Sequence, residues 1–274
     1  MEPVGNIGQV YSAVQKAKTG ASGFVTNFFP VQRKLQGWIE QGDLFCESDE
    51  SAVLFFRKDR DFRHLYFCAA NAAVLQERMT ASVVLKKERV MTDLIGNEAA
   101  LSDLLVVLKA VGFRQYTRLC RMARTAPVET QKQSPIDSQV VCATQADCRA
   151  ILDLLETSFD RYGEQLPMLY ELETAVADRQ ILVAKHEGAI AGLLFFETQG
   201  FTSTVRYWLV DEPFRSFRFG SALMHRYFET QCAVRRFILW VIADNENAIQ
   251  KYRHYGFAPE GLVDCVLANR MIPA

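Results

Sequence analysis

One short string near the C-terminus constrains the fold of this chain more than any other feature. It runs from Asn245 to Phe257 in the form Asn-x-x-Ala-x-x-x-Tyr-x-x-x-Gly-Phe, and it follows the apolar, strand-like run 237–242. Asparagine is a preferred helix N-cap, and Gly256 supplies the left-handed end of a helix. The string therefore predicts a strand, a short helix over 247–254 and a further strand.

A segment upstream of this string has the layout of a phosphate cradle. The strand-like run 207–210 leads through Asp-Glu-Pro-Phe-Arg-Ser-Phe-Arg-Phe into an amphipathic helix that begins at Gly220 and ends near Thr230. Backbone N–H groups and the positive dipole end at a helix N-terminus favour phosphate groups. The alternative interpretation of this turn is a solvated basic surface.

Together the two segments resemble the acetyl-CoA-binding core of the Gcn5-related N-acetyltransferase (GNAT) superfamily, over roughly Gln139 to Met271. In that family a turn of the form Arg/Gln-x-x-Gly-x-Gly/Ala wraps the pyrophosphate. Arg215 holds its first position and Gly220 its last, whereas Arg218 replaces the first glycine. Glycine there permits positive φ and a close approach to phosphate, although an arginine can add a charge-assisted contact instead.

The resemblance implies a set of residues that hold the cofactor, acetyl-CoA. They are Leu209, Val210, Arg215, Ser216, Phe217, Arg218, Phe219, Gly220, Ser221, Asn245, Ala248 and Tyr252. A backbone N–H at Leu209 or Val210 would polarise the thioester carbonyl, unless it makes an ordinary strand bond. Asn245 would bond the pantetheine arm, cap its helix, or do both.

The same resemblance implies the residues that move protons. Tyr252 is the candidate acid, because a neutral phenol can donate to a departing thiolate; the alternative is a core aromatic. Glu197, at the end of a strand, is the candidate base, with Tyr207 and Asp244 behind it. The loop 160–167 is the expected lip of the acceptor site. The substrate-binding residues that the resemblance implies are Arg161, Tyr162 and Tyr207.

Length and repetition predict two domains. A chain of 274 residues with 49% hydrophobic content can bury two cores of ordinary size. The stretch 125–137 is polar, holds two prolines and lacks an apolar period, so it is expected to link a domain over 1–124 to a catalytic domain over 138–274.

The first half resembles a degenerate copy of the second. Gly112-Phe113 and the run that follows mirror Gly256-Phe257 and its run, but Leu108 stands where Tyr252 stands and no Arg-x-x-Gly-x-Gly turn precedes it. The copy is therefore expected not to bind the cofactor. The fold class that follows is α/β (α+β), with two tandem GNAT-like domains, each a mixed, mainly antiparallel sheet flanked by helices. The opposite interpretation is that the two Gly-Phe pairs coincide by chance.

Alternating and helical patterns predict the remaining elements of the second half. They are a strand over 140–142, helices over 147–159 and 166–178, a hairpin of 180–184 and 190–196 that turns at Glu187-Gly188, and a final strand over 261–270. In the first half, a helix over 31–40 and strands over 42–45, 52–56 and 65–68 are expected to repeat part of this order.

Charge and cysteine content exclude several classes of partner. The net charge is −1 and no long block of like charge occurs, which argues against nucleic acid and anionic membranes as partners. The seven cysteines are scattered singly, which fits reduced thiols better than disulfides or a metal site. With no apolar run of signal or membrane-spanning length, we expect a cytoplasmic monomer or homodimer.

The function expected from the resemblance is transfer of an acetyl group from acetyl-CoA to a primary amine of a small molecule or peptide, without a metal. Two alternatives stay open. One is a non-catalytic module that senses acyl-CoA or scaffolds a partner, which the replaced glycine at Arg218 keeps possible. The other is a tRNA-dependent aminoacyl transferase of the tandem type, which the complete Tyr252 motif and the absence of a basic surface disfavour.

Overall fold

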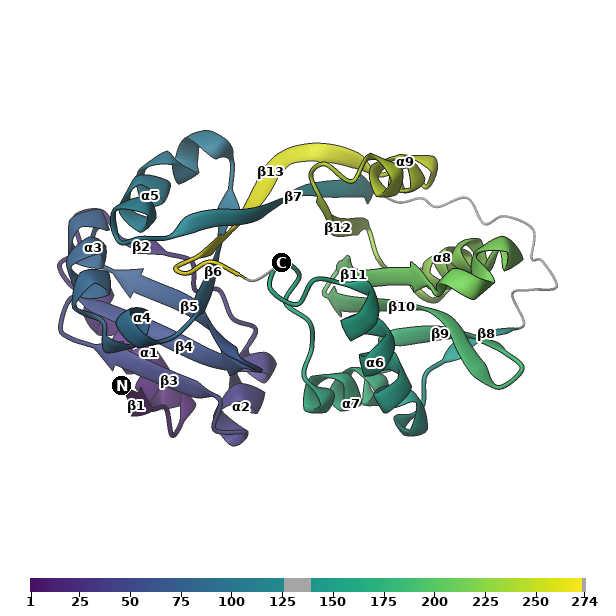
Figure 1. The fold of residues 1–274 in the computed structure, drawn as a ribbon, viewed down its shortest axis with the longest axis horizontal. Coiled ribbons are helices and arrows are strands. Elements are labelled where there is room, and N and C mark those ends of the chain that lie inside the picture. The colour runs from purple at the N-terminus through teal and green to yellow at the C-terminus, as the bar shows by residue number, and fades with distance from the viewer. Residues whose placement is uncertain (126–138, 273–274) are drawn as a thin grey trace. The chain divides into compact units, whose positions relative to one another are not determined.

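The computed structural model describes residues 1–125 and 139–272, which form two compact units of mixed α/β structure (Figure 1). Unit 1 comprises Met1–Leu119 together with Gly261–Ala274, and unit 2 comprises Cys120–Glu260. The polar stretch expected to link two domains lies, apart from Thr125, outside the described residues. None of the helices in the described ranges is long and apolar enough to cross a bilayer.

Unit 2 is a mainly antiparallel sheet with the strand order β7-β12-β11-β10-β9-β8. Its elements, in chain order, are β7 (Arg114–Thr125, shared with unit 1), β8 (Val140–Cys142), the 3₁₀ helix η2 (Gln145–Asp147), α6 (Cys148–Ser158), α7 (Leu169–Ala177), β9 (Ile181–His186), β10 (Ala189–Gln199), β11 (Thr202–Val210), the 3₁₀ helix η3 (Glu212–Phe217), α8 (Phe219–Thr230), β12 (Arg236–Ile242) and α9 (Glu246–His254). The strands and helices expected for the second half of the sequence are present, with ends shifted by a few residues, but most of the final strand, β13 (Ala258–Ala268), belongs to unit 1.

The helix expected over 166–178 begins only at Leu169. The residue before a proline is biased away from helical φ and ψ, which keeps Leu166 out of the helix. The helix instead starts where the backbone N–H of Met168 donates to the Glu171 carboxylate at 2.8 Å, one half of a capping box.

Period-two alternation along the strands divides the core of unit 2 into two layers. Leu194, Phe196 and Trp208 belong to the core under α8 and α9. Their neighbours Leu193, Phe195 and Tyr207 belong to the core under α6 and α7. Helices therefore cover both faces of the sheet, as Figure 1 shows for α8 on one side and α6 with α7 on the other.

The two parallel strands at the centre of unit 2 diverge. β11 pairs with β12 only from Thr202 opposite Arg236 to Val205 opposite Leu239, although both strands continue beyond the last pair. At the same point the register between β10 and β11 shifts, so that Arg206 is an extra residue in β11. The bulge and the divergence leave residues 207–210 with one open edge.

Unit 1 repeats this order with the strands β1-β3-β4-β5-β6-β13 and with β2 paired to β5. Its elements are β1 (Glu2–Pro3), α1 (Ile7–Lys18), β2 (Val25–Thr26), α2 (Gln32–Glu40), β3 (Leu44–Ser48), β4 (Ala52–Asp59), β5 (Phe62–Ala69), α3 (Ala72–Ala81), α4 (Val83–Lys87), β6 (Val90–Gly96), α5 (Glu98–Ala110) and β13 (Ala258–Ala268). The elements expected in this half from the sequence repeat are α2, β3, β4 and β5.

The two units exchange their last strands. β13 comes from the C-terminal end of the chain, yet it pairs antiparallel with β6 and places Val263, Cys265 and Leu267 in the core of unit 1. β7 comes from the N-terminal half, yet it pairs with β12 and places Met122 in the core of unit 2. The units therefore differ from the ranges 1–124 and 138–274 expected from the sequence, because a local pattern does not encode which sheet a strand joins.

In unit 1 the gap between the two central parallel strands is closed from within. β5 pairs with β6 at Arg63 opposite Val90 and at His64 opposite Met91, and the two strands then separate. The side chain of Asn27, which follows β2, bridges them. Its amide donates to the carbonyl of Asp93 on β6 at 3.0 Å and to that of Leu65 on β5 at 3.2 Å.

The side chain of Asn27 makes two further hydrogen bonds to the same strands. The Asn27 carbonyl accepts from the backbone N–H of Phe67 at 2.7 Å, and its amide also donates to the Thr92 hydroxyl at 3.0 Å. The side chain thus bonds backbone groups of both strands where they no longer pair with each other, including the N–H of Phe67. Unit 1 has the fold of unit 2, with this opening occupied by its own chain.

Candidate functional site

The open edge of β11 in unit 2 is the centre of the candidate site. The backbone N–H of Asp211 donates to the carbonyl of Ala191 on β10 at 2.9 Å. Because N–H directions alternate along a strand, the N–H of Leu209 also points to β10, whereas that of Val210 points to the open side. Of the two donors expected from the sequence, the geometry favours Val210.

A close approach between two strands fixes this donor, and sequence reasoning did not identify the residue that permits it. Gly192 on β10 pairs with Val210, and a Cβ atom placed on it would lie 2.8 Å from the carbonyl oxygen of Leu209. No side chain fits there without moving the β11 backbone. A glycine inside a strand is the sequence signal that could have indicated this approach.

The expected phosphate turn lies directly after β11. It consists of η3, the residue Arg218 and the first turn of α8, and Arg218 has φ 60° and ψ 17°. This is the left-handed conformation that favours glycine, so the backbone has the positive φ that a glycine would permit although the residue is an arginine. The first N–H groups of α8 are not used inside the helix and form a donor cluster at its N-terminus.

The side chains of this turn divide by exposure. Arg215, Ser216, Phe217 and Arg218 are exposed, Phe219 is buried, and Gly220 and Ser221 are half-buried. Arg215 lies 3.6 Å from Glu212 between two well-exposed side chains, which leaves its charge solvated. The Ser221 hydroxyl lies 2.9 Å from that of Tyr255.

Helix α9 brings the second motif to the same region. The Asn245 side chain accepts from the backbone N–H of Ala248 at 3.1 Å, which is the helix cap that the sequence predicts. Ala248 and Tyr252 are half-buried against the core under α8 and α9. The ring of Tyr252 lies 5.5 Å from that of Trp208, in the diverging part of β11.

The environment of Tyr252 keeps its phenol protonated. Burial, together with the negative charge of Glu164, raises its pKa above the ordinary value. A phenol with a raised pKa is neutral at physiological pH and can donate a proton. The contacts of its ring also make Tyr252 part of the core, and a core aromatic can act as a proton donor as well.

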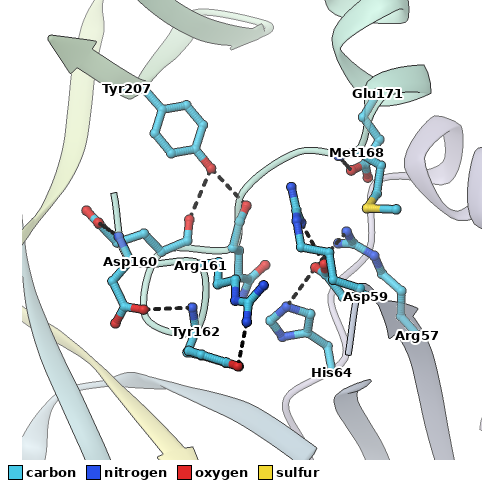
Figure 2. A network of polar contacts seen from close by, with 12 residues as sticks. Arg57, Asp59, His64, Asp160, Arg161, Tyr162, Met168, Glu171 and Tyr207 are labelled. Carbon is cyan, nitrogen blue, oxygen red and sulfur yellow. Dashed lines mark hydrogen bonds and ion pairs between the residues drawn. The ribbon is translucent and has the colours of Figure 1, made fainter. Parts of the chain in front are cut away.

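The loop 159–168 between α6 and α7 is fastened to β11 through Tyr207. The Tyr207 hydroxyl donates to the carbonyl oxygens of Glu164 at 3.0 Å and Gln165 at 2.8 Å (Figure 2). Burial raises the pKa of Tyr207 to about 12, so this phenol is a proton donor at neutral pH and a poor base.

Arg161 and Tyr162, the other two expected acceptor-binding residues, contact one another in this loop. The Arg161 guanidinium donates to the Tyr162 hydroxyl at 2.9 Å, and the backbone N–H of Tyr162 donates to Asp160 at 3.1 Å (Figure 2). Tyr162 is buried and Arg161 is exposed. These bonds add contacts within the loop to its attachment to β11.

Two carboxylates near β11, those of Glu197 and Glu164, lie in different parts of the sheet. Glu197 lies on β10 opposite Thr204, and Thr204 belongs to the part of β11 that still pairs with β12. The Glu197 carboxylate is 3.8 Å from Arg206. Glu164, which sequence reasoning did not single out, lies in the loop fastened to the diverging part of β11. Asp244, the further candidate, is exposed before α9.

Unit 1 carries different residues at the equivalent places. Leu108 on α5 is fully buried in the apolar core, with no phenol to offer. The β4–β5 hairpin holds a buried charged cluster in which Asp59 lies 3.3 Å from both Arg57 and His64 (Figure 2). Arg60 contacts the other oxygen of the same carboxylate at 2.7 Å, so the charge of Asp59 is compensated within the hairpin.

Comparison with known proteins gives one family match. Residues 148–257 match the family model described as the acetyltransferase (GNAT) family. No curated protein matches the chain.

Solved structures share the fold over nearly the whole chain. A tandem GNAT protein from the clavulanic acid biosynthesis pathway is similar with a TM-score of 0.60 at 10% identity, covering 99% of each chain. A GCN5-related N-acetyltransferase from Sphaerobacter thermophilus has a TM-score of 0.56 at 16% identity, covering 96% of this chain and 90% of that one. One from Kribbella flavida has a TM-score of 0.58 at 14% identity, with coverage of 95% and 96%. The fold is that of two GNAT-like units in tandem.

Proposed function

We propose that unit 2 transfers an acetyl group from acetyl-CoA to a primary amine, and that unit 1 does not bind the cofactor. The observation that carries the proposal is the divergence of β11 and β12 after Val205 and Leu239, beside a helix N-terminus and a protonated phenol. In unit 1 the corresponding divergence is filled by Asn27.

The residues of unit 2 fit an acyl-CoA. An extended pantetheine arm carries amide groups that can pair with the open edge of β11, as an added strand would. The left-handed residue Arg218 turns the chain so that the N-terminus of α8 is free to receive a pyrophosphate. When bound, the thioester supplies an activated acyl group.

The chain's own groups then have distinct tasks. The Val210 N–H is placed to hydrogen-bond the thioester oxygen as negative charge develops on it, and one such donor contributes on the order of 3 kcal/mol. Tyr252 would donate its proton to the departing sulfur. Gly192 keeps β10 close enough to fix the position of this part of β11.

The acceptor is expected to enter beside the loop 159–168, where Arg161 is exposed and positively charged. An amine acceptor that also carries a carboxylate, whether a small molecule or a peptide, would suit this charge. The two sources are distinguished by the assay below, which includes both.

The test measures binding and turnover separately. The melting temperature of the full chain is measured with and without acetyl-CoA, since a ligand at a hundredfold excess over Kd stabilises by about 2.7 kcal/mol. Release of the CoA thiol is then followed with a panel of amino acids, polyamines and short peptides. Binding with turnover supports the proposal. Binding without turnover on any amine indicates a sensor or scaffold, and the absence of binding overturns the proposal.

A further inference from the structure

We propose that Glu164 is the general base that takes the proton from the acceptor amine. The inference rests on the proposed function and deepens it, because the sequence favoured Glu197 for this role.

The first argument is position. Glu164 lies in the loop 159–168, and its backbone carbonyl is bound by the hydroxyl of Tyr207 at 3.0 Å. Tyr207 belongs to the part of β11 that has left β12, two residues after the last paired position Val205. Glu164 is therefore held beside the diverging part of β11, on the side of the sheet covered by α6 and α7.

The second argument is a loop held in a defined and costly conformation. Gln165, the next residue, has φ 46°, which is uncommon for a residue with a side chain. The backbone N–H of Asp160 donates to the Glu164 carboxylate at 3.2 Å, and the N–H of Glu164 donates back to the Asp160 carbonyl at 3.0 Å. The first bond orients the carboxylate and the second fixes the backbone of the turn, and strain of this kind persists where the surroundings fix it.

The third argument is electrostatic reach. The charge of Glu164 acts on the phenols of both Tyr252 and Tyr207 and raises the pKa of each. The carboxylate of Glu164 is therefore close enough to the expected acid for its charge to act on the phenol. The ionisable groups around this space are Asp160 and Arg161 on the loop, Tyr207 and Arg206 on β11, Glu171 on α7 and Tyr252 on α9.

Burial tunes this carboxyl for proton transfer. It raises the pKa of Glu164 from 4.5 to about 7, repulsion from Asp160 adds to the shift, and the N–H of Asp160 partly opposes it. A base is most effective when its pKa lies near the working pH. Glu197 differs, because its carboxylate lies 3.8 Å from the Arg206 guanidinium and in the part of the sheet where β11 still pairs with β12.

Glu164 and Tyr252 together account for both protons that move during the transfer. As the amine nitrogen bonds to the acyl carbon and the carbon–sulfur bond breaks, one N–H proton passes to the Glu164 carboxylate. The phenol of Tyr252 gives its proton to the sulfur. Glu164 then loses its proton to solvent and Tyr252 regains one, so that amine and thioester yield amide and free thiol.

The test compares Glu164→Gln with Glu197→Gln and with Glu173→Gln, an exposed glutamate on α7 that serves as the matched control. Wild type and variants are assayed by thiol release from acetyl-CoA with the best amine of the panel, from pH 5.5 to 9.5. We expect Glu164→Gln to lower kcat on the order of 10²-fold, to leave KM for acetyl-CoA unchanged, and to remove the acidic limb near pH 7. The two other variants should keep that limb.

Two readouts do not depend on turnover. Because the folded pKa of Glu164 lies above 4.5, its stabilising contribution is complete below that pH and is lost as pH rises through about 7. Glu164→Gln should therefore raise the melting temperature more at pH 8 than at pH 5. It should also lower the pKa of Tyr252 in an ultraviolet phenol titration, since the neighbouring charge is gone.

The outcomes separate the two proposals. If wild type turns over and Glu164→Gln retains full rate and the same acidic limb, Glu164 is not the base and the proposed function stands. If instead Glu197→Gln loses the limb, that carboxylate is the base. If wild type neither binds acetyl-CoA nor turns over, while the pH shift in melting of Glu164→Gln is absent as well, both proposals fail.

Discussion

At the scale of single residues, Arg218 shows how a sequence can depart from a motif while its backbone does not. Its φ of 60° is the conformation that the family glycine permits. A left-handed residue with a Cβ atom is disfavoured by roughly 1–2 kcal/mol. The arginine is therefore retained in an unfavourable conformation, which is reason to test its side chain separately from its backbone.

We expect Arg218→Gly to raise the free energy of unfolding relative to Arg218→Ala by about 1 kcal/mol, because only glycine relieves the strain. Chemical denaturation measures this difference. Binding of CoA at several salt concentrations tests the charge. Equal affinity in all three proteins would mean that the side chain does not touch phosphate. Weaker and less salt-dependent binding by both variants would make Arg218 a phosphate ligand.

Tyr252 carries the second prediction at this scale. Tyr252→Phe removes the hydroxyl but keeps the ring that packs on Trp208. We expect kcat to fall on the order of 10²-fold with little change in KM for acetyl-CoA. A general acid works only while protonated, and the raised pKa keeps Tyr252 protonated from pH 5.5 to 9.5, so the variant should lose rate evenly across this range. Full turnover across pH would leave Tyr252 as a core aromatic.

At the scale of elements, β2 and Asn27 explain why one copy of the fold keeps its opening and the other does not. We expect Asn27→Ala to destabilise unit 1 by about 2–3 kcal/mol, because the N–H of Phe67 loses its acceptor inside the sheet and the bonds from the Asn27 amide to both strands are lost. Asn71→Ala, which removes only the cap of α3, is the matched control and should cost about 1 kcal/mol.

Neither asparagine variant should gain affinity for acetyl-CoA in unit 1, since that unit has no phosphate turn. Calorimetric titration checks this with the binding of unit 2 as the reference. A second binding event in Asn27→Ala would show that the asparagine alone blocks a competent site, and would contradict the interpretation of unit 1 as a degenerate copy.

The elements near the motif were predictable from the sequence because their signals are local. The cap at Asn245, the turn at Glu187-Gly188, where both residues have positive φ, and the alternation along β10 each depend on residues close in the chain. Glu164 and Asn27 were not predictable in this way. Each depends on which distant strand its loop is fastened to, and nothing in the neighbouring residues indicates that strand.

At the scale of the whole molecule, the exchange of β7 and β13 makes each unit depend on sequence from the other half. Unit 1 is complete only with Gly261–Ala274, and unit 2 only with the end of β7. A chain cut at 138 keeps the motifs of unit 2 but loses Met122 from its core, and a chain that ends at 124 lacks the β13 strand that pairs with β6. Separate expression of the two sequence halves is therefore expected to give two incomplete sheets.

The exchange predicts that point changes act on the unit opposite to their place in the sequence. Leu267 near the C-terminus is fully buried in unit 1, and Met122 in the first half is fully buried in unit 2. Truncating either to alanine should lower the free energy of unfolding by about 2–5 kcal/mol.

Acetyl-CoA binding shows which unit a substitution destabilises, because a ligand stabilises only the unit that binds it. We expect Met122→Ala to lower the transition that acetyl-CoA raises, and Leu267→Ala to lower the other one, as measured by scanning calorimetry of the full chain. If Leu267→Ala instead lowers the ligand-sensitive transition while Met122→Ala leaves it unchanged, the strands are not exchanged and each half closes its own sheet.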